Sequence, residues 1–85
     1  MNAVQPATGF AYAVGEEVVA RLDRAEIFDV TRGVELAAGP RPRWTIGSVV
    51  DCISMGGGRG YVLCTRHRGD TYVCVVPEDG IDGVA

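Results

Sequence analysis

Three cysteines and one histidine are the side chains of this 85-residue chain with the widest possible chemistry. Three thiolates and an imidazole form a known zinc-binding set, and here they would be Cys52, Cys64, Cys74 and His67. The cysteines lie 12 and 10 residues apart and lack the usual Cys-x-x-Cys knuckle. Each also lies in an apolar stretch, where a free cysteine behaves as a small hydrophobe. We therefore predict that the cysteines pack against other residues, and we expect no metal and no other cofactor.

Catalytic groups are also few. His67 is followed by Asp70 in the segment Arg66-His67-Arg68-Gly69-Asp70, and this pair would suit acid–base catalysis. Gly69 and Asp70 are equally typical of a solvated turn, which we favour. The glycine run at 55–60 lacks the Lys-Ser/Thr and the helix of a phosphate-binding loop, and it predicts a hairpin turn. No catalytic residue is predicted, and the sequence favours a protein that is not an enzyme.

Aromatic residues beside arginines are the best candidates for binding. Trp44 follows Arg41 and Arg43 in the sequence Arg41-Pro42-Arg43-Trp44, and it could form a groove with Tyr12 and Tyr61. Such a groove would suit a protein or peptide ligand. The alternative is that Trp44 packs at the edge of the fold and closes it.

Composition restricts the class of protein. The chain is 47% hydrophobic and 22% charged, as expected of one small globular domain. Its net charge of −3 argues against a general nucleic-acid binder, which needs a basic surface. The alternative is a local basic patch, which would have to be assembled from Arg41, Arg43, Arg59, Arg66 and Arg68.

The expected location is the cytoplasm, away from any membrane. Residues 1–9 are small and polar, and they predict a flexible N-terminal tail rather than a secretory signal. No stretch approaches the ~20 apolar residues of a membrane span. Three cysteines cannot all pair within one chain, which fits free thiols in a reducing compartment.

Short apolar strands separated by turns must position these residues. We expect strands within Phe10–Leu22, with a turn at Gly15, and at Trp44–Ser54, Tyr61–Arg66, Thr71–Val76 and Ile81–Val84. Gly47 inside the second of these suggests a bulge or a bend. The stretch 23–43 reads as a long loop that folds back, and its RAEIFDV segment suits either a helical turn or a ragged strand.

The order of these motifs resembles that of SH3-like barrels. The segments concerned are VGEEV at 14–18, GSVV at 47–50, YVL at 61–63 and VPEDGI at 76–81. The resemblance implies a five-stranded SH3-like barrel over residues 10–85, with a long loop between the first and second strands. It is specific for fold rather than function, because this barrel serves binding modules, subunit domains and some enzymes.

Two families of this kind offer weaker similarities. The type II plasmid-borne dihydrofolate reductases have a Val-Gln-Ile-Tyr pore motif before a proline. The matching residues here are Val73-Cys74-Val75-Val76 before Pro77, so the Gln and Tyr that contact cofactor and substrate are missing. The barrel domain of nitrile hydratase β subunits is similar only in features that the whole fold shares.

Strands 61–66 and 71–76 are apolar on both faces, whereas a half-solvated strand alternates with polar residues. Either the long loop or a second subunit must cover the outer face. We predict a homo-oligomer whose interface contains Val62, Cys64, Tyr72, Cys74 and Val76.

Three functional hypotheses follow. The first is a non-catalytic, self-associating interaction module of bacterial origin. A mobile genetic element is one source that this hypothesis includes. The second is an oligomeric small-molecule binder or enzyme with its site between subunits. The third is a nucleic-acid-binding barrel.

Overall fold

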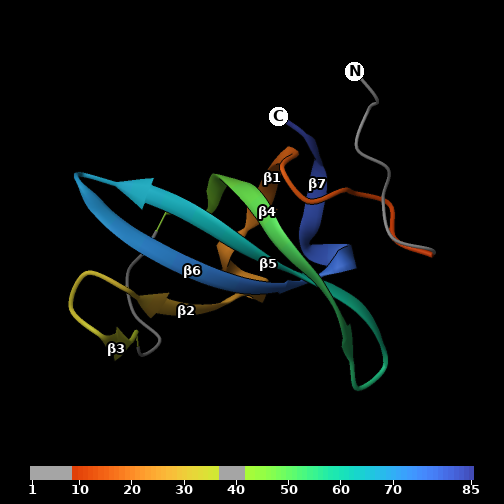
Figure 1. The fold of residues 1–85 in the computed structure, drawn as a ribbon, viewed down its shortest axis with the longest axis horizontal. Coiled ribbons are helices and arrows are strands. Elements are labelled where there is room, and N and C mark those ends of the chain that lie inside the picture. Colours follow the sequence, from red (N-terminus) through yellow and green to blue (C-terminus); the bar gives the residue numbers. More distant parts are fainter. Residues whose placement is uncertain (1–8, 37–41) are drawn as a thin grey trace.

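Seven strands form one antiparallel sheet in the computed structural model, which describes residues 9–36 and 42–85 (Figure 1). The strands are β1 (Glu17–Arg21), β2 (Glu26–Asp29), β3 (Val34–Glu35), β4 (Trp44–Met55), β5 (Gly58–His67), β6 (Asp70–Pro77) and β7 (Ile81–Val84). Two short 3-10 turns, η1 (Leu22–Arg24) and η2 (Glu78–Gly80), precede β2 and β7. The prediction of an all-β chain is confirmed. The expected tail at residues 1–9 lies, except for Gly9, outside the described residues.

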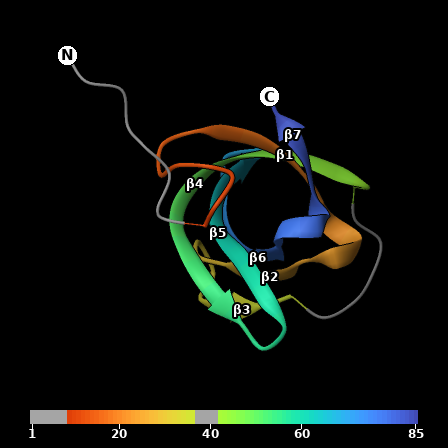
Figure 2. The same ribbon diagram turned by 90° about the vertical axis from the view of Figure 1, so that its right-hand side faces the viewer.

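The strand order across the sheet is β3-β2-β6-β5-β4-β1-β7. Strands β4, β5 and β6 form a meander, and β1 pairs with both β4 and β7. The sheet curls around its inner face (Figure 2), but its edge strands β3 and β7 do not pair with each other. The sheet has two strands more than the five expected, because the long stretch after β1 contributes β2 and β3.

The inner face of the curled sheet carries the core. Its central row runs across four strands as Ile27, Cys74, Leu63 and Val49, all of them buried. The other buried apolar residues packed with this row are Val18, Ala20, Leu22, Tyr61, Val76 and Ile81. In β1 the buried Val18 and Ala20 alternate with exposed or half-buried neighbours.

A two-residue turn sets the register of β5 against β6. Arg68 has φ 51° and Gly69 has φ 82°, so both central residues take the left-handed conformation that hairpin turns of this length need. His67 therefore pairs with Asp70, and every later pair along the hairpin follows from it, including Cys64 with Val73.

The bulge of β4 lies three residues later than the glycine suggested. The β4–β5 register shifts between Val49 and Asp51, so Val50 is the extra residue. Gly47 instead allows close packing, because a Cβ there would lie 3.2 Å from the Leu63 Cβ. The prediction of a bulge in this strand was correct in kind and wrong in position.

Of the two structures that the RAEIFDV segment suited, the chain forms the strand, preceded by a 3-10 turn that ends at Arg24. Leu22–Arg24 makes the 3-10 turn η1, and Glu26–Asp29 makes β2, which pairs with β6 from Glu26↔Val75 to Asp29↔Tyr72. This excursion therefore extends the sheet at its edge, and in its described part it is not a loop lying over the sheet.

A buried carboxylate holds the β2–β3 hairpin to the β5–β6 hairpin. Asp29 is 2% exposed and accepts hydrogen bonds from the backbone N–H and the guanidinium of Arg32, at 3.1 and 2.8 Å. The same guanidinium donates to Asp70 at 2.8 Å. Burial by itself raises the pKa of Asp29, but the hydrogen bonds and the positive charge of Arg32 outweigh it, and the pKa is lowered.

Candidate functional site

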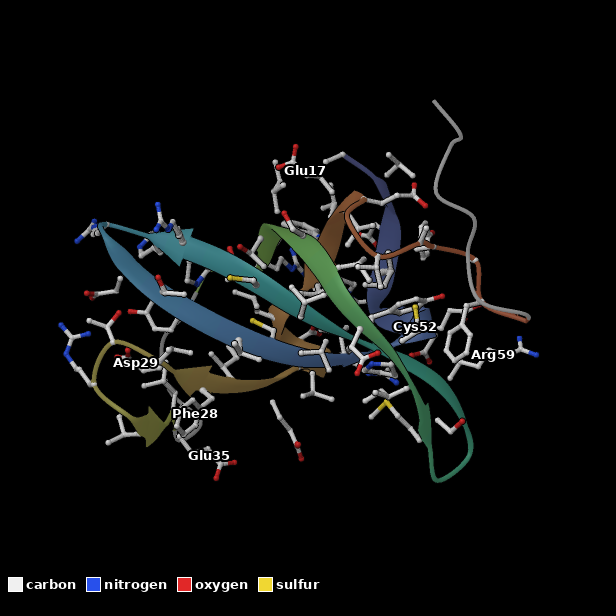
Figure 3. The ribbon with its side chains drawn as sticks, viewed as in Figure 1. Glu17, Phe28, Asp29, Glu35, Cys52 and Arg59 are labelled. Atoms are coloured by element: carbon white, nitrogen blue, oxygen red, sulfur yellow. The ribbon has the colours of Figure 1, made fainter. Side chains whose placement is uncertain are left out.

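An uncovered apolar surface extends across the outside of the sheet. Cross-strand pairing aligns one continuous row from β3 to β1, whose members are Glu35, Phe28, Val73, Cys64, Ser48 and Glu17. Figure 3 labels both ends of this row, Glu35 and Glu17, with Phe28 beside Glu35. The row is apolar in its centre and acidic at both ends.

A second row lies beside the first and has the same character. It runs from β2 to β4 as Glu26, Val75, Val62 and Asp51. Ile46, from the outward side of β4, and Val50, at the bulge, are 55% and 48% exposed, and Phe28 is 42% exposed. We define the outer face as Phe28, Ile46, Val50, Val62, Cys64, Val73 and Val75.

Only part of the predicted interface lies on this outer face. Val62 and Cys64 do, and both are half-buried. Cys74 and Val76 are fully buried in the core, and Tyr72 shares their inward orientation. The prediction was wrong for these three residues, because the register places Val73 opposite Cys64 and Val75 opposite Val62.

The sequence did hold a signal for the correct residues. Arg68-Gly69 is a two-residue turn, and such a turn fixes the pair His67–Asp70. Counting from that pair places Cys64 opposite Val73 three residues on and Val62 opposite Val75 five residues on, so these four residues share one face of the hairpin. Treating the whole of 67–70 as a loop left this register undetermined.

The three cysteines do not share one face. Cys74 lies in the core and Cys52 packs beside Tyr61, whereas Cys64 is on the outer face. Burial, followed by the negative charge of Asp51, raises the pKa of the Cys52 thiol. Within residues 9–36 and 42–85 no three His, Cys, Asp or Glu side chains are grouped so as to hold a metal ion.

The predicted aromatic groove is not assembled. Tyr61 is fully buried, and its ring meets those of Tyr12 and Phe10 edge to face at 5.5 and 5.8 Å. Its hydroxyl donates to Glu78 at 3.0 Å and accepts from the Ala11 N–H at 3.0 Å. Tyr61 therefore anchors the segment before β1, and the prediction that it contacts a ligand was wrong.

Trp44 lies at the other end of the molecule from this cluster. The Tyr12 carbonyl contacts Cys52, and Cys52 is eight residues further along β4 than Trp44, up to about 26 Å of extended strand. Trp44 is 47% exposed, and the Arg43 guanidinium lies 5.0 Å from the centroid of its ring. The predicted partner Arg41 lies outside the described residues.

Two of the arginines named for nucleic-acid binding, Arg59 and Arg66, do not share one patch. Arg59 lies near the start of β5 and Arg66 near its end, about 23 Å apart along an extended strand. Arg68 lies in the turn beyond Arg66.

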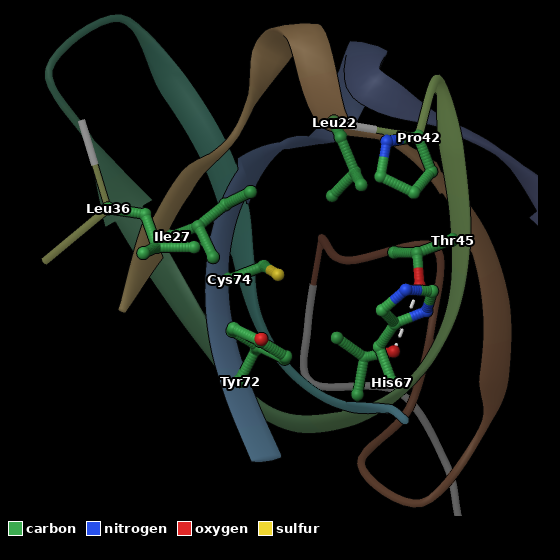
Figure 4. A pocket seen from close by; sticks show the side chains of 9 residues that line it. Leu22, Ile27, Leu36, Pro42, Thr45, His67, Tyr72 and Cys74 are labelled. Atoms are coloured by element: carbon green, nitrogen blue, oxygen red, sulfur yellow. Dashed lines mark hydrogen bonds between the residues drawn. The ribbon is translucent and has the colours of Figure 1, made fainter. Parts of the chain in front are cut away.

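A separate pocket opens at the end of the inner face (Figure 4), with a volume of about 240 Å³. Apolar groups form most of its wall, and they belong to Leu22, Ile27, Leu36, Pro42 and Cys74. The polar lining residues are Thr45, Thr65, His67 and Tyr72. Sequence patterns could not indicate this pocket, because its lining comes from η1, β2, β4, β5, β6 and the chain between β3 and β4.

Two threonines form a short hydrogen-bond chain in the pocket wall. The Thr65 hydroxyl donates to the Ile46 carbonyl at 2.8 Å, and it lies 2.9 Å from the Thr45 hydroxyl (dashed in Figure 4). Since Thr65 uses its proton on Ile46, the proton of the Thr45 hydroxyl goes to Thr65 or to the Ile46 carbonyl, which lies 3.4 Å away. Both protons are then engaged, and the pair presents oxygen lone pairs to the pocket.

Comparison with family models, curated proteins and solved structures gave no significant match. The helices among the described residues are three-residue turns, and none has the length and apolar character to cross a membrane.

Proposed function

We propose that this chain is a non-catalytic binding module that self-associates through its outer face. The observation that carries the proposal is that β2, β4, β5 and β6 bear apolar residues on both faces, while one small interior can bury only the inner set. A contiguous exposed apolar patch on a small protein is typical of an interaction surface.

The finer fold belongs to the same proposal. We assign the chain to the SH3-like barrels, with β1, β4, β5, β6 and β7 as the five barrel strands. The hairpin of β2 and β3 takes the place of the long loop between the first two. The pairing of β1 with both β4 and β7, and the turn η2 directly before β7, support this assignment.

The expected occupant of the outer face is a second copy of the chain. Either the long excursion between β1 and β4 or another subunit could cover this face. The described part of the excursion pairs as β2 at the sheet edge, and its own Phe28 adds to the exposed surface. In a two-fold dimer each copy covers the same patch on the other. An 85-residue domain has a small core and gains from such burial.

The charges around the outer face fit an interface with a polar rim. Glu35, Glu17, Glu26 and Asp51 end the two rows, and the centre is apolar, as is usual for protein interfaces. Like-charged rims repel one another at low ionic strength, and salt screens this repulsion. Self-association should therefore strengthen as salt is added, whereas binding of nucleic acid would weaken.

Light scattering coupled to size-exclusion chromatography tests the proposal. The wild-type chain is expected to elute as a multiple of 9.0 kDa, more completely at high salt. Val62→Asp places a charge in the centre of the outer face, and this variant should elute at 9.0 kDa with an unchanged circular dichroism spectrum. Ser54→Asp, at an exposed site near the β4–β5 turn, is the matched control and should keep the wild-type mass.

Two results would overturn the proposal. One is a wild-type monomer at about 100 µM at every salt concentration, a level at which a specific interface of this kind is occupied. The other is a Val62→Asp protein that is folded and still assembles like the wild type.

A further inference from the structure

We propose that the pocket at the end of the inner face binds a flat, uncharged ring that carries one N–H or O–H donor, as indole and phenol do. This site is formed within one chain and is separate from the outer face. It therefore does not depend on self-association.

The size of the pocket sets the size of the ligand. An apolar cavity of about 150 Å³ is large enough for benzene. The volume of about 240 Å³ here admits a somewhat larger ring system, and it falls short of the pockets that hold drug-sized molecules.

The walls of the pocket favour an uncharged ring. Ile27 and Cys74 lie on one side and Leu22 and Pro42 on another (Figure 4). Among the described lining residues there is no Asp, Glu, Lys or Arg that would pair with a charged ligand. The nearest buried carboxylate in the sheet, Asp29, is already paired with Arg32.

The threonine pair selects the polar group of the ligand. Thr65 donates to the Ile46 carbonyl, and Thr45 has both the Thr65 oxygen and the Ile46 carbonyl as acceptors, so both hydroxyl protons are engaged within the wall. The Thr45 oxygen keeps free lone pairs and can accept. A ring with a donor would satisfy it, and a ring with only an acceptor would not. Thr45 is half-buried, which leaves its oxygen within reach of a bound ring.

A nuclear magnetic resonance titration of the ¹⁵N-labelled full chain tests this site. Indole should cause saturable shifts of the Thr45, Thr65 and Cys74 amides, with a Kd on the order of 0.1–1 mM, as expected for a ring of about nine heavy atoms. The compound 1-methylindole has the same ring without the donor, and it should bind about five-fold more weakly, as for one lost hydrogen bond.

A pair of matched variants isolates the threonine. Thr45→Val keeps the shape and removes the acceptor, and it should abolish most of the preference for indole over 1-methylindole. Thr71→Val makes the same change in β6, on the face that points away from the pocket, and it should leave the preference for indole intact. Thr65 keeps its bond to the Ile46 carbonyl in both variants, so both are expected to fold.

The natural source of the ring is either a free small molecule or an aromatic side chain of another protein. N-acetyl-tryptophanamide distinguishes them, because it carries the indole with a peptide backbone attached. Binding at least as tight as that of indole supports a side chain, and loss of binding supports a free ring. Absence of saturable shifts up to about 5 mM indole would overturn the site, and equal affinity for indole and 1-methylindole would overturn donor recognition.

Discussion

Replacing Tyr61 by Phe removes one oxygen atom that ties together three segments. The hydroxyl accepts from the Ala11 N–H and donates to the Glu78 carboxylate, both at 3.0 Å, and the side chain is fully buried. The change leaves the ring and its edge contacts with Phe10 and Tyr12 in place. It therefore tests the hydrogen bonds separately from the packing.

The size of the effect follows from what each partner loses. A neutral hydrogen bond contributes about 1 kcal/mol net, and one to a charged group about 1.5–3 kcal/mol. Ala11 is exposed and Glu78 half-buried, so water can partly replace the hydroxyl at both. We expect the free energy of unfolding to fall by about 1–2 kcal/mol, which lowers Tm by roughly 4–16 °C for a domain of this size.

Urea unfolding followed by circular dichroism measures this loss, with hydrogen exchange of the Ala11 and Tyr12 amides as a local readout. Tyr72→Phe is the matched control, because no hydrogen bond joins the Tyr72 hydroxyl to the described residues, and its effect should stay within about 0.5 kcal/mol. Equal destabilisation by the two substitutions would refute the anchoring role of Tyr61.

The decrease of the free energy of unfolding at alkaline pH provides a second test of the role of Tyr61. Burial, and next the hydrogen bond to Glu78 and its negative charge, raise the pKa of Tyr61 above its ordinary value of 10.0, although backbone N–H groups partly oppose this. When the pKa of a group is higher in the folded than in the unfolded protein, the group stabilises the fold at pH values below its unfolded pKa. This stabilisation is lost as the pH rises through the folded pKa. Tyr61→Phe should therefore flatten the decline of stability above about pH 10.

Two further predictions concern the acid limb and the turn before β7. The lowered pKa of Asp29 contributes stability above its ordinary value of 3.8 that is lost as pH falls through the folded pKa, so Arg32→Gln should flatten the decline of the urea midpoint between about pH 5 and 2. If the urea midpoint of Arg32→Gln fell with pH as steeply as that of the wild type, the result would contradict this. Gly80→Ala places a Cβ 2.7 Å from the Val76 Cγ1 and should lower stability by about 1–3 kcal/mol. Gly57→Ala enters open space and should change the thermal midpoint little; similar losses in both would argue against the close packing at Gly80.

Local pattern was sufficient for the strands after residue 44. Ile81–Val84 is predicted and observed with the same bounds, and the two hairpin strands differ from prediction only at their ends. These elements depend on β-branched runs and on glycine at turns, which act over a few residues. The stretch 23–43 is different, because β2 exists through its pairing with β6, which is distant in the sequence.

The candidate surfaces also depend on contacts between strands that are distant in the sequence. Cys74 and Val75 are adjacent and both apolar, yet one is in the core and the other on the outer face. When both faces of a strand are apolar, hydrophobic alternation carries no information about which side is inside. The Arg68-Gly69 turn fixes which residues of β5 and β6 share a face, and the curl of the sheet decides which of the two sets is buried.

The sequence by itself determined an all-β chain, its last strands and turns, and an apolar surplus too large for one interior. The tertiary structure decided which half of that surplus is exposed, since cross-strand register sorts neighbouring residues between faces. It also created the pocket, whose wall joins Leu22, Ile27, Thr45 and Cys74 from separate elements. No spacing along the chain encodes such a wall, because it exists only where the sheet curls until distant strands face one another.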